Sequence, residues 1–183
     1  MVLMRLGSCV RRFALLSLCT PGLAFADAAY QYEGNPFQDV AGRYTTSDSL
    51  SGTIHLSSPL APDLSNAAIS LTSWSFSDGL KTFTELDSQI EPPFVSTDAS
   101  GRIVAWSLDF SNGSGEVMGT FNNGPADQID QATDFSGGNS LASNMAAPGT
   151  WTALPEPSLG ALAGLALAAV SLLGAAQRSL LSQ

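Results

Sequence analysis

Apolar and polar residues alternate with a period of two over several short segments between residues 27 and 154, and this alternation predicts β-strands. The clearest segment has apolar residues at every second position: Val104, Trp106, Leu108 and Phe110. Gly, Asn, Asp and Pro residues typical of turns separate the segments, and no helical periodicity of useful length occurs among them. The pattern therefore predicts an all-β fold, a sandwich-like antiparallel domain.

Two hairpins are expected in this domain. Asp78-Gly79 belongs to the strongest class of hairpin signal, and a two-residue turn there would place Trp74 opposite Phe83 and Phe76 opposite Lys81. A second hairpin is expected over residues 94–110, where a three-residue loop with a bulge and a four-residue loop both fit. Further strands are expected over residues 30–33, 50–56, 116–121 and 150–153.

Residues 122–148 are rich in Asn, Gly, Ser, Ala and Asp, and this composition predicts a long loop with at most a short ordered piece at 129–135. Asp127, Asp130 and Asp134 lie in this segment at a spacing that one helical turn would bring together. Carboxylate oxygens suit calcium, although the segment lacks an EF-hand loop and a glycine-rich calcium repeat. The alternative interpretation is a solvated acidic loop.

Charge and cysteine content narrow the classes of function. Residues 27–154 contain fifteen acidic and three basic residues, which gives a net charge of −12. Nucleic acids and anionic lipids need clustered Lys and Arg, so we expect no nucleic-acid partner. The acidity favours solubility, or alternatively affinity for divalent cations or cation-bridged polysaccharide. Both cysteines, Cys9 and Cys19, precede the domain, which therefore lacks a disulfide, a thiol nucleophile and a thiolate metal ligand.

The remaining candidate residues favour a structural interpretation. His55 is the only histidine, alternates with Ile54 and Leu56, and is expected to face solvent rather than to act in catalysis. Three tryptophans, Trp74, Trp106 and Trp151, suggest either core packing or a platform on which sugars stack, and we expect Trp151 to be the most exposed. A secreted hydrolase would need two carboxylates across a cleft, which sequence does not reveal. We therefore expect that the protein is not an enzyme and that it binds no cofactor.

The first 26 residues resemble a secretory signal peptide. Arg5, Arg11 and Arg12 precede an apolar stretch that is shorter than the roughly 20 residues of a membrane-spanning helix. Ala24-Phe25-Ala26 matches the small-residue pattern of a cleavage site, which predicts cleavage before Asp27. A twin-arginine signal at Arg11-Arg12 and a lipoprotein signal at Cys19 are alternatives that the neighbouring residues fit poorly.

The last thirty residues contain a second candidate targeting signal. Pro155-Glu156-Pro157 is followed by an uncharged apolar run over residues 159–176, and Arg178 then supplies a basic residue. Eighteen residues approach the length of a transmembrane helix, although Ala and Gly make this run only weakly apolar. The alternative is an ordinary linker before a permanent membrane anchor. The chain thus divides into a signal peptide (1–26), a β-sandwich ectodomain (27–153) and a C-terminal sorting segment (154–183).

This tail resembles the PEP-CTERM sorting signal. Pro155, Glu156 and Pro157 match the sorting tripeptide, residues 159–176 match its transmembrane helix, and Arg178 alone stands for its basic cluster. The resemblance implies export by the secretion machinery and processing by an exosortase, a membrane cysteine transpeptidase-like enzyme of Gram-negative bacteria that make extracellular polysaccharide. Segments of the middle also resemble β-rich ectodomains common among such proteins: residues 30–37, 44–48, 57–60, 96–101 and 149–151.

These signals predict a route for the chain. It is exported, anchored briefly in the inner membrane by its C-terminal helix, and then placed at the cell surface or in the extracellular matrix. The expected role is structural, or one of interaction, associated with exopolysaccharide. A carbohydrate- or calcium-binding module is the alternative, and a secreted hydrolase is a third.

Overall fold

The structure is a computed structural model, and it describes residues 27–136 and 138–155. The described part of the chain contains thirteen β-strands and no helix. The first seven strands are β1 (Ala28–Pro36), β2 (Asp39–Ala41), β3 (Ser49–Leu56), β4 (Ala67–Ala68), β5 (Ser73–Ser77), β6 (Thr82–Thr84) and β7 (Gln89–Ile90). The remaining six are β8 (Phe94–Thr97), β9 (Ile103–Ser111), β10 (Glu116–Asn122), β11 (Gln128–Asp134), β12 (Ser140–Met145) and β13 (Thr150–Ala153).

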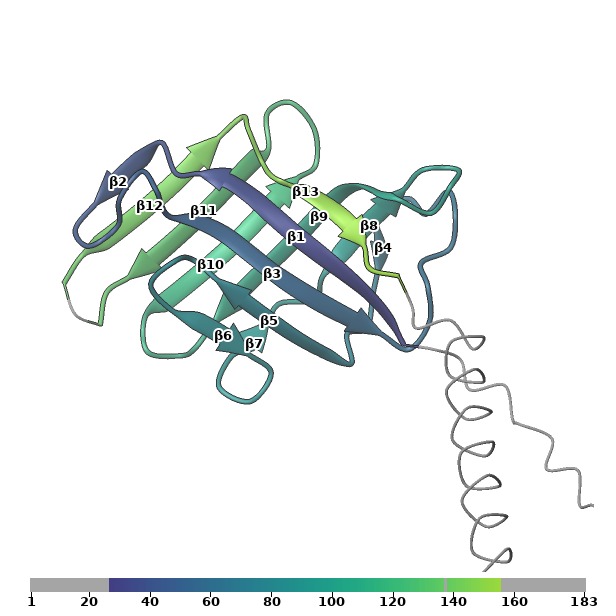
Figure 1. Cartoon of the computed structure of the whole chain (residues 1–183), viewed down its shortest axis with the longest axis horizontal. Helices are drawn as coiled ribbons and strands as arrows, with labels where there is room; N and C mark the ends of the chain where they lie inside the picture. The colour runs from purple at the N-terminus through teal and green to yellow at the C-terminus, as the bar shows by residue number, and fades with distance from the viewer. Residues whose placement is uncertain (1–26, 137, 156–183) are drawn as a thin grey trace, which may run out of the picture.

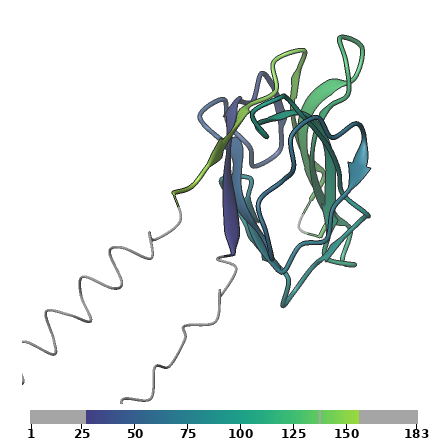
Figure 2. The same cartoon turned by 90° about the vertical axis from the view of Figure 1, so that its right-hand side faces the viewer.

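The strands form two antiparallel sheets that face each other, as the sequence pattern predicts (Figures 1 and 2). The five-stranded sheet has the order β13-β1-β3-β5-β6. The eight-stranded sheet has the order β2-β12-β11-β10-β9-β8-β4, and β7 also pairs with β9. Figure 2 shows the two layers edge-on, and the buried hydrophobic side chains of both sheets form one core cluster.

Aromatic rings from both sheets meet in the core. The centroids of the Phe76 and Phe110 rings lie 4.4 Å apart, and the Tyr32 ring lies 5.0 Å from Trp151 and 5.8 Å from Trp106. Phe76 is accommodated by a glycine on the neighbouring strand, since a Cβ at Gly52 would clash with its ring. The aromatic rings therefore join β1, β5, β9 and β13 into one packed layer.

The hairpin at Asp78 forms with a different register from the expected one. Phe76 lies opposite Phe83, rather than opposite Lys81. The amide of Asp78 donates to the carbonyl of Lys81 over 3.2 Å, so the two turn residues are Gly79, at φ +93°, and Leu80. The turn is therefore one residue later than predicted, which moves every cross-strand pair by two positions.

The second hairpin settles the choice between the two loops and contains a bulge. Asp98 donates its amide to the carbonyl of Arg102 over 2.9 Å, which leaves a three-residue loop ending in Gly101 at φ +82°. Beyond the loop, the pairing shifts between Ser96 and Thr97, so that the extra residue on β9 reverses the alternation. Val104 is therefore 50 % exposed, contrary to expectation, while Trp106, Leu108 and Phe110 are buried as expected.

The segment expected to be a long loop contains two strands of the larger sheet. β11 pairs with β10 over residues 128–134 and with β12 over most of its length. The short ordered piece expected at 129–135 corresponds to β11, whereas the expectation of a loop was wrong for β12. Both strands are hard to recognise because their inward-facing side chains are small or polar rather than apolar: Asp130, Ala132, Asp134, Ser140, Ala142 and Asn144. Their composition is typical of a loop, whereas their position is that of a core face.

Both ends of the domain leave it side by side. Tyr30 near the start of β1 pairs with Ala153 at the end of β13, and the Leu154 amide donates to the Ala29 carbonyl over 2.8 Å. Within the described residues, no helix is long and apolar enough to cross a membrane. The predicted cleavage residues Ala24 and Ala26, and the C-terminal sorting signal beyond Pro155 (Glu156, Pro157, the 159–176 helix and Arg178), lie outside the described residues.

Candidate functional site

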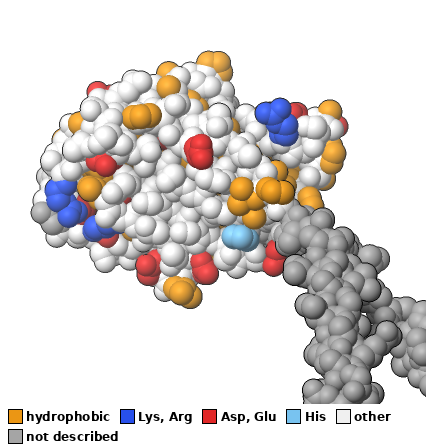
Figure 3. Space-filling view, in the orientation of Figure 1, with side chains coloured by type: hydrophobic (Ala, Val, Ile, Leu, Met, Phe, Trp, Pro, Cys, Tyr) orange, Lys and Arg blue, Asp and Glu red, His pale blue; other side chains and the backbone are white. Residues whose placement is uncertain are grey.

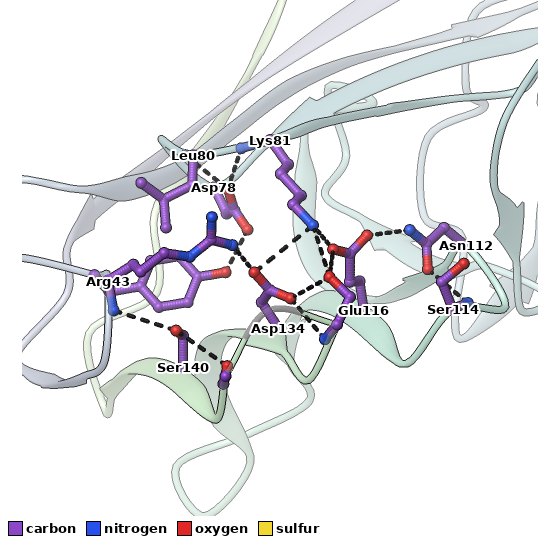
Figure 4. Close-up of polar contacts among 12 residues, drawn as sticks. Arg43, Asp78, Leu80, Lys81, Asn112, Ser114, Glu116, Asp134 and Ser140 are labelled. Carbon is purple, nitrogen blue, oxygen red and sulfur yellow. Dashed lines mark hydrogen bonds and ion pairs between the residues drawn. The ribbon is translucent and has the colours of Figure 1, made fainter.

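A cluster of charged side chains lies at the end of the sandwich opposite the first and last described residues, and Figure 4 shows its contacts. We call this cluster the polar pole, and it consists of Arg43, Asp78, Lys81, Glu116 and Asp134. Lys81 follows the β5–β6 turn of the five-stranded sheet, whereas Glu116 and Asp134 are paired neighbours on β10 and β11 of the other sheet. The polar pole therefore connects the two sheets through side chains.

In the polar pole the acids Glu116 and Asp134 are buried, whereas their cations reach the surface, and the Arg43 side chain is 52 % exposed. The Lys81 Nζ atom contacts Glu116 Oε1 directly and lies 3.6 Å from Asp134 Oδ2, which Arg43 also contacts. The side chains of Glu116 and Asp134 are only 7 % and 2 % exposed, whereas that of Lys81 is 31 % exposed. Since two buried carboxylates would repel each other strongly, the two cations are what allow both to remain inside the fold.

Neutral donors complete the surroundings of Glu116. The Ser136 hydroxyl lies 2.6 Å from Glu116 Oε1 and 2.8 Å from Asp134 Oδ1, so it bridges the two acids. The Asn112 side-chain amide donates to Glu116 Oε2. Both oxygens of this buried carboxylate thus have a hydrogen-bond donor in addition to the lysine.

Asp78 fixes the turn that presents Lys81. Its Oδ1 atom accepts the amides of Leu80 and Lys81 over 2.9 and 2.8 Å, while the Tyr44 hydroxyl donates to Oδ2 over 2.6 Å. Burial raises the pKa of Tyr44, and the Asp78 carboxylate raises that pKa further. Tyr44 is therefore a hydrogen-bond donor at any physiological pH, and the turn is held from two sides.

A second polar centre lies deeper, between the aromatic rings and β11. The Tyr32 hydroxyl donates to Asp130 Oδ1 over 2.6 Å and accepts the Gly149 amide over 2.7 Å. Burial raises the pKa of Asp130, and the hydrogen bonds to its carboxylate act in the opposite direction. The pKa of Tyr32 is raised mainly by burial and further by the charge of Asp130. Nearby, the Trp106 indole donates to the Thr120 hydroxyl over 2.8 Å. These bonds satisfy the Tyr32 hydroxyl, Asp130 Oδ1 and the Trp106 indole, whereas the buried Asp130 Oδ2 atom has no hydrogen-bond partner among the described residues.

The three aspartates proposed as a weak calcium site are separated by the fold. The expected helical turn is a strand, in which Asp130 and Asp134 face inward and Asp127 lies in the preceding turn. Asp130 pairs with Tyr32, Asp134 pairs with Arg43 and Lys81, and Asp127 accepts a hydrogen bond from Asn123. Across residues 27–136 and 138–155, no three His, Cys, Asp or Glu side chains are grouped so that they could hold a metal ion.

The structure places the histidine and the tryptophans in structural positions. His55 is half-buried on the outer face of β3, between the buried Ile54 and Leu56. Trp106 is buried and Trp74 is partly buried against the core. Trp151, which was expected to be the most exposed, is partly buried like Trp74, and its ring packs against Tyr32, Phe76 and Trp106. The three tryptophans therefore do not form an exposed platform.

One edge of Trp151 borders a surface pocket of about 510 Å³ near the chain ends. Tyr30 and Leu60 form its apolar wall, and Arg102 and Thr152 contribute polar groups. Arg102 has no ion pair among the described residues, unlike Arg43 and Lys81. On the face drawn in Figure 3, acidic side chains are scattered, whereas basic side chains gather at two separate places.

Sequence reasoning missed most of the polar pole. It named Asp134 only as a metal candidate, and it considered Lys81 and Asp78 only in the hairpin register. Arg43, Glu116 and Lys81 are far apart along the chain, so only the pairing of the two sheets brings them together. No short motif marks such a cluster, and a correct register for β5–β6 was needed to place Lys81 at its end.

Comparison with known proteins adds no family or function: no family model, no curated protein and no solved structure matches the chain.

Proposed function

We propose that this chain is an exported surface or extracellular-matrix protein, whose ectodomain has a structural or interaction role associated with exopolysaccharide. An exosortase-like membrane enzyme would act on its tail after the secretion machinery has exported it. The support is the order of signals along the sequence: a basic and apolar leader, an acidic β domain, and Pro155-Glu156-Pro157 before an apolar run. Proline disfavours helix in the residue before it, and on this ground we expect the tripeptide to remain accessible to the enzyme.

The arrangement of the ectodomain is compatible with this route. Because β1 and β13 are paired, the leader and the tail join the same end of the sandwich. A domain held by its tail would then direct the polar pole away from the bilayer, while its net negative charge would keep it from anionic lipid. The expected residence in the inner membrane is temporary, and the final location is the cell surface or the matrix.

The test is to replace Pro155-Glu156-Pro157 by three alanines and to follow the protein by cell fractionation and intact mass. We expect the variant to stay in the membrane fraction with its C-terminus intact, whereas the native chain is released in a shortened form. Pro92→Ala, which changes an exposed proline of the ectodomain next to Glu91, serves as the control and is expected to behave like the native chain. Identical size and location of native chain and tripeptide variant would refute the sorting proposal.

A carbohydrate-binding role is the second candidate, and the pocket beside Trp151 is the observation that favours it. An indole, a phenol ring and a guanidinium that has no ion pair among the described residues are groups that contact sugars and acidic sugars in particular. Binding of exopolysaccharide fragments that is lost in Arg102→Ala and unaffected by a chelator would support a metal-independent pocket. Binding that a chelator removes would instead support the calcium-dependent form of this role.

A further inference from the structure

We propose that Lys81 and Glu116 join to form an intramolecular amide bond, which would covalently link the two sheets at the polar pole. The Lys81 Nζ atom already contacts Glu116 Oε1. The lysine follows the β5–β6 turn, and the glutamate begins β10 in the opposite sheet. The bond would supply the cross-link that the cysteine-free region 27–154 cannot obtain from a disulfide.

The fixed positions of Lys81 and Glu116 favour formation of the amide bond. The turn that carries Lys81 is fixed by Asp78 and Tyr44, and Glu116 is held by β10 and by the Asn112 and Ser136 donors. Two reacting groups kept in contact by a folded scaffold behave as if each were present at a very high concentration, which offsets the unfavourable equilibrium of amide formation in water. The low exposure of Glu116, at 7 %, also keeps away the water that would reverse the step.

The surrounding groups provide a path for the protons. Asp134 Oδ2, 3.6 Å from Nζ, accepts one proton from the lysine ammonium, and the contact with Arg43 holds this carboxylate in place. The neutral amine then attacks Cδ of Glu116, forming the N–C bond. Asn112 donates to Oε2 and stabilises the negative charge that develops on it.

The step closes with the loss of water. The Ser136 hydroxyl carries protons to the leaving oxygen, because it lies 2.6 Å from Glu116 Oε1, 2.8 Å from Asp134 Oδ1 and 3.3 Å from Lys81 Nζ, which donates to it. It passes on the proton that the aspartate accepted, once rotation of the carboxyl group has brought that proton from the Oδ2 to the Oδ1 position, and then the second proton that Nζ releases after the attack. The Cδ–Oε1 bond breaks, and Oε1 departs as water with two protons that Nζ carried. One positive and one negative charge disappear together, Asp134 returns to its starting state, and neither an oxidant nor a nucleotide is consumed.

Tryptic digestion of the denatured, purified chain tests the proposal. Arg43, Lys81 and Arg102 are the only basic residues in residues 27–154, so an unlinked chain gives separate fragments 44–81 and 82–102 and a third that begins at Ile103. An acylated Lys81 is not cleaved. We therefore expect fragment 44–102 to remain attached to the fragment that begins at Ile103, with a mass one water below their sum.

Lys81→Arg is the matched control. It keeps the positive charge beside Glu116 and the tryptic site, but a guanidinium is not a nucleophile at neutral pH, so the linked species should disappear. Asp134→Asn, which removes the base and not the lysine, should lower the linked fraction at least tenfold. A native chain at its full mass that yields the three separate fragments overturns the proposal, and so does a linked species that persists in Lys81→Arg.

Discussion

The inner faces of the two halves of this sandwich are built from different residues. Around β5 and β9, the interior consists of aromatic rings, with Phe76 and Phe110 in contact at 4.4 Å. Around β11 and β12, it consists of Asp, Ser, Asn and Ala side chains, yet Asp130 and Asn144 are as fully buried as the rings. Burial in this domain is therefore set by the position of a strand in the sheet and not by the polarity of its side chains.

The two halves are stabilised by different means. The aromatic half gains free energy from the apolar area that it removes from water. The polar half depends on partners from elsewhere in the fold: Tyr32 donates to Asp130, Asn144 donates to the Pro36 carbonyl over 3.1 Å, and Arg43 contacts Asp134. A partner lost from this half leaves a buried group without compensation, whereas an atom lost from the aromatic half leaves a cavity.

Phe76→Ala is expected to have the largest effect. The ring is fully buried between Tyr32, Phe110 and Trp151, so its removal should lower the free energy of unfolding by about 3–5 kcal/mol. Urea unfolding followed by tryptophan fluorescence measures this loss. Val104→Ala, on the exposed side of the β9 bulge, should change stability by less than about 0.5 kcal/mol. Equal losses in the two variants would contradict the placement of the aromatic layer.

The same contrast explains how much of the fold could be predicted from the sequence. The all-β class and the strands around Phe76, Trp106 and Phe110 follow from regular alternation, because aromatic and branched residues there face the core. β11 was expected only as a short ordered piece and β12 was not expected, because their inward positions carry Asp, Ser and Asn. Sequence patterns detect an apolar face and have no signal for a polar one that is neutralised by distant partners.

Single backbone details account for the other differences. A turn at Gly79-Leu80 rather than Asp78-Gly79 moved the pairing of β5 with β6, and one extra residue on β9 turned Val104 outward. The position of the turn and the position of the bulge each differ by a single residue from the expected one, and the sequence is compatible with both alternatives. The candidate site was therefore harder to predict than the fold, because Lys81 reaches Glu116 only when the turn, the register and the packing of the two sheets are all correct.

Tyr32→Phe examines the boundary between the two halves. The ring keeps its aromatic contacts, but Asp130 Oδ1 and the Gly149 amide both lose their partner. Because both groups are buried, we expect a loss of about 1–3 kcal/mol in the free energy of unfolding, measured by urea denaturation with an unchanged m-value. A neutral result would mean that water reaches Asp130, contrary to its full burial.

Asp130→Asn should change the pH dependence of stability more than stability itself. Burial raises the pKa of Asp130 in the folded state above its ordinary value of 3.8. A carboxyl group whose pKa is higher in the folded state than in the unfolded state stabilises the fold at a pH below the unfolded-state pKa. This stabilisation is lost as the pH rises through the folded-state pKa. The native chain should therefore lose stability relative to Asp130→Asn as the pH rises from 3.8, by about 1.4 kcal/mol for each pH unit that separates the two values. Parallel curves of unfolding free energy against pH for the two chains would contradict this.

Asp127→Asn should have the smallest effect and isolates the role of burial within one short segment. Asp127 is exposed in the turn before β11, where its Oδ2 atom accepts a hydrogen bond from Asn123 over 2.9 Å. Since an asparagine oxygen can accept the same bond and the site is open to water, we expect a change of less than about 0.5 kcal/mol at every pH between 4 and 8. Calcium should not shift the melting temperature of the native chain or of Asp127→Asn, because Asp127, Asp130 and Asp134 do not share a site. If Asp127→Asn instead reproduced the pH profile of Asp130→Asn, the difference between the two acids would not lie in their burial.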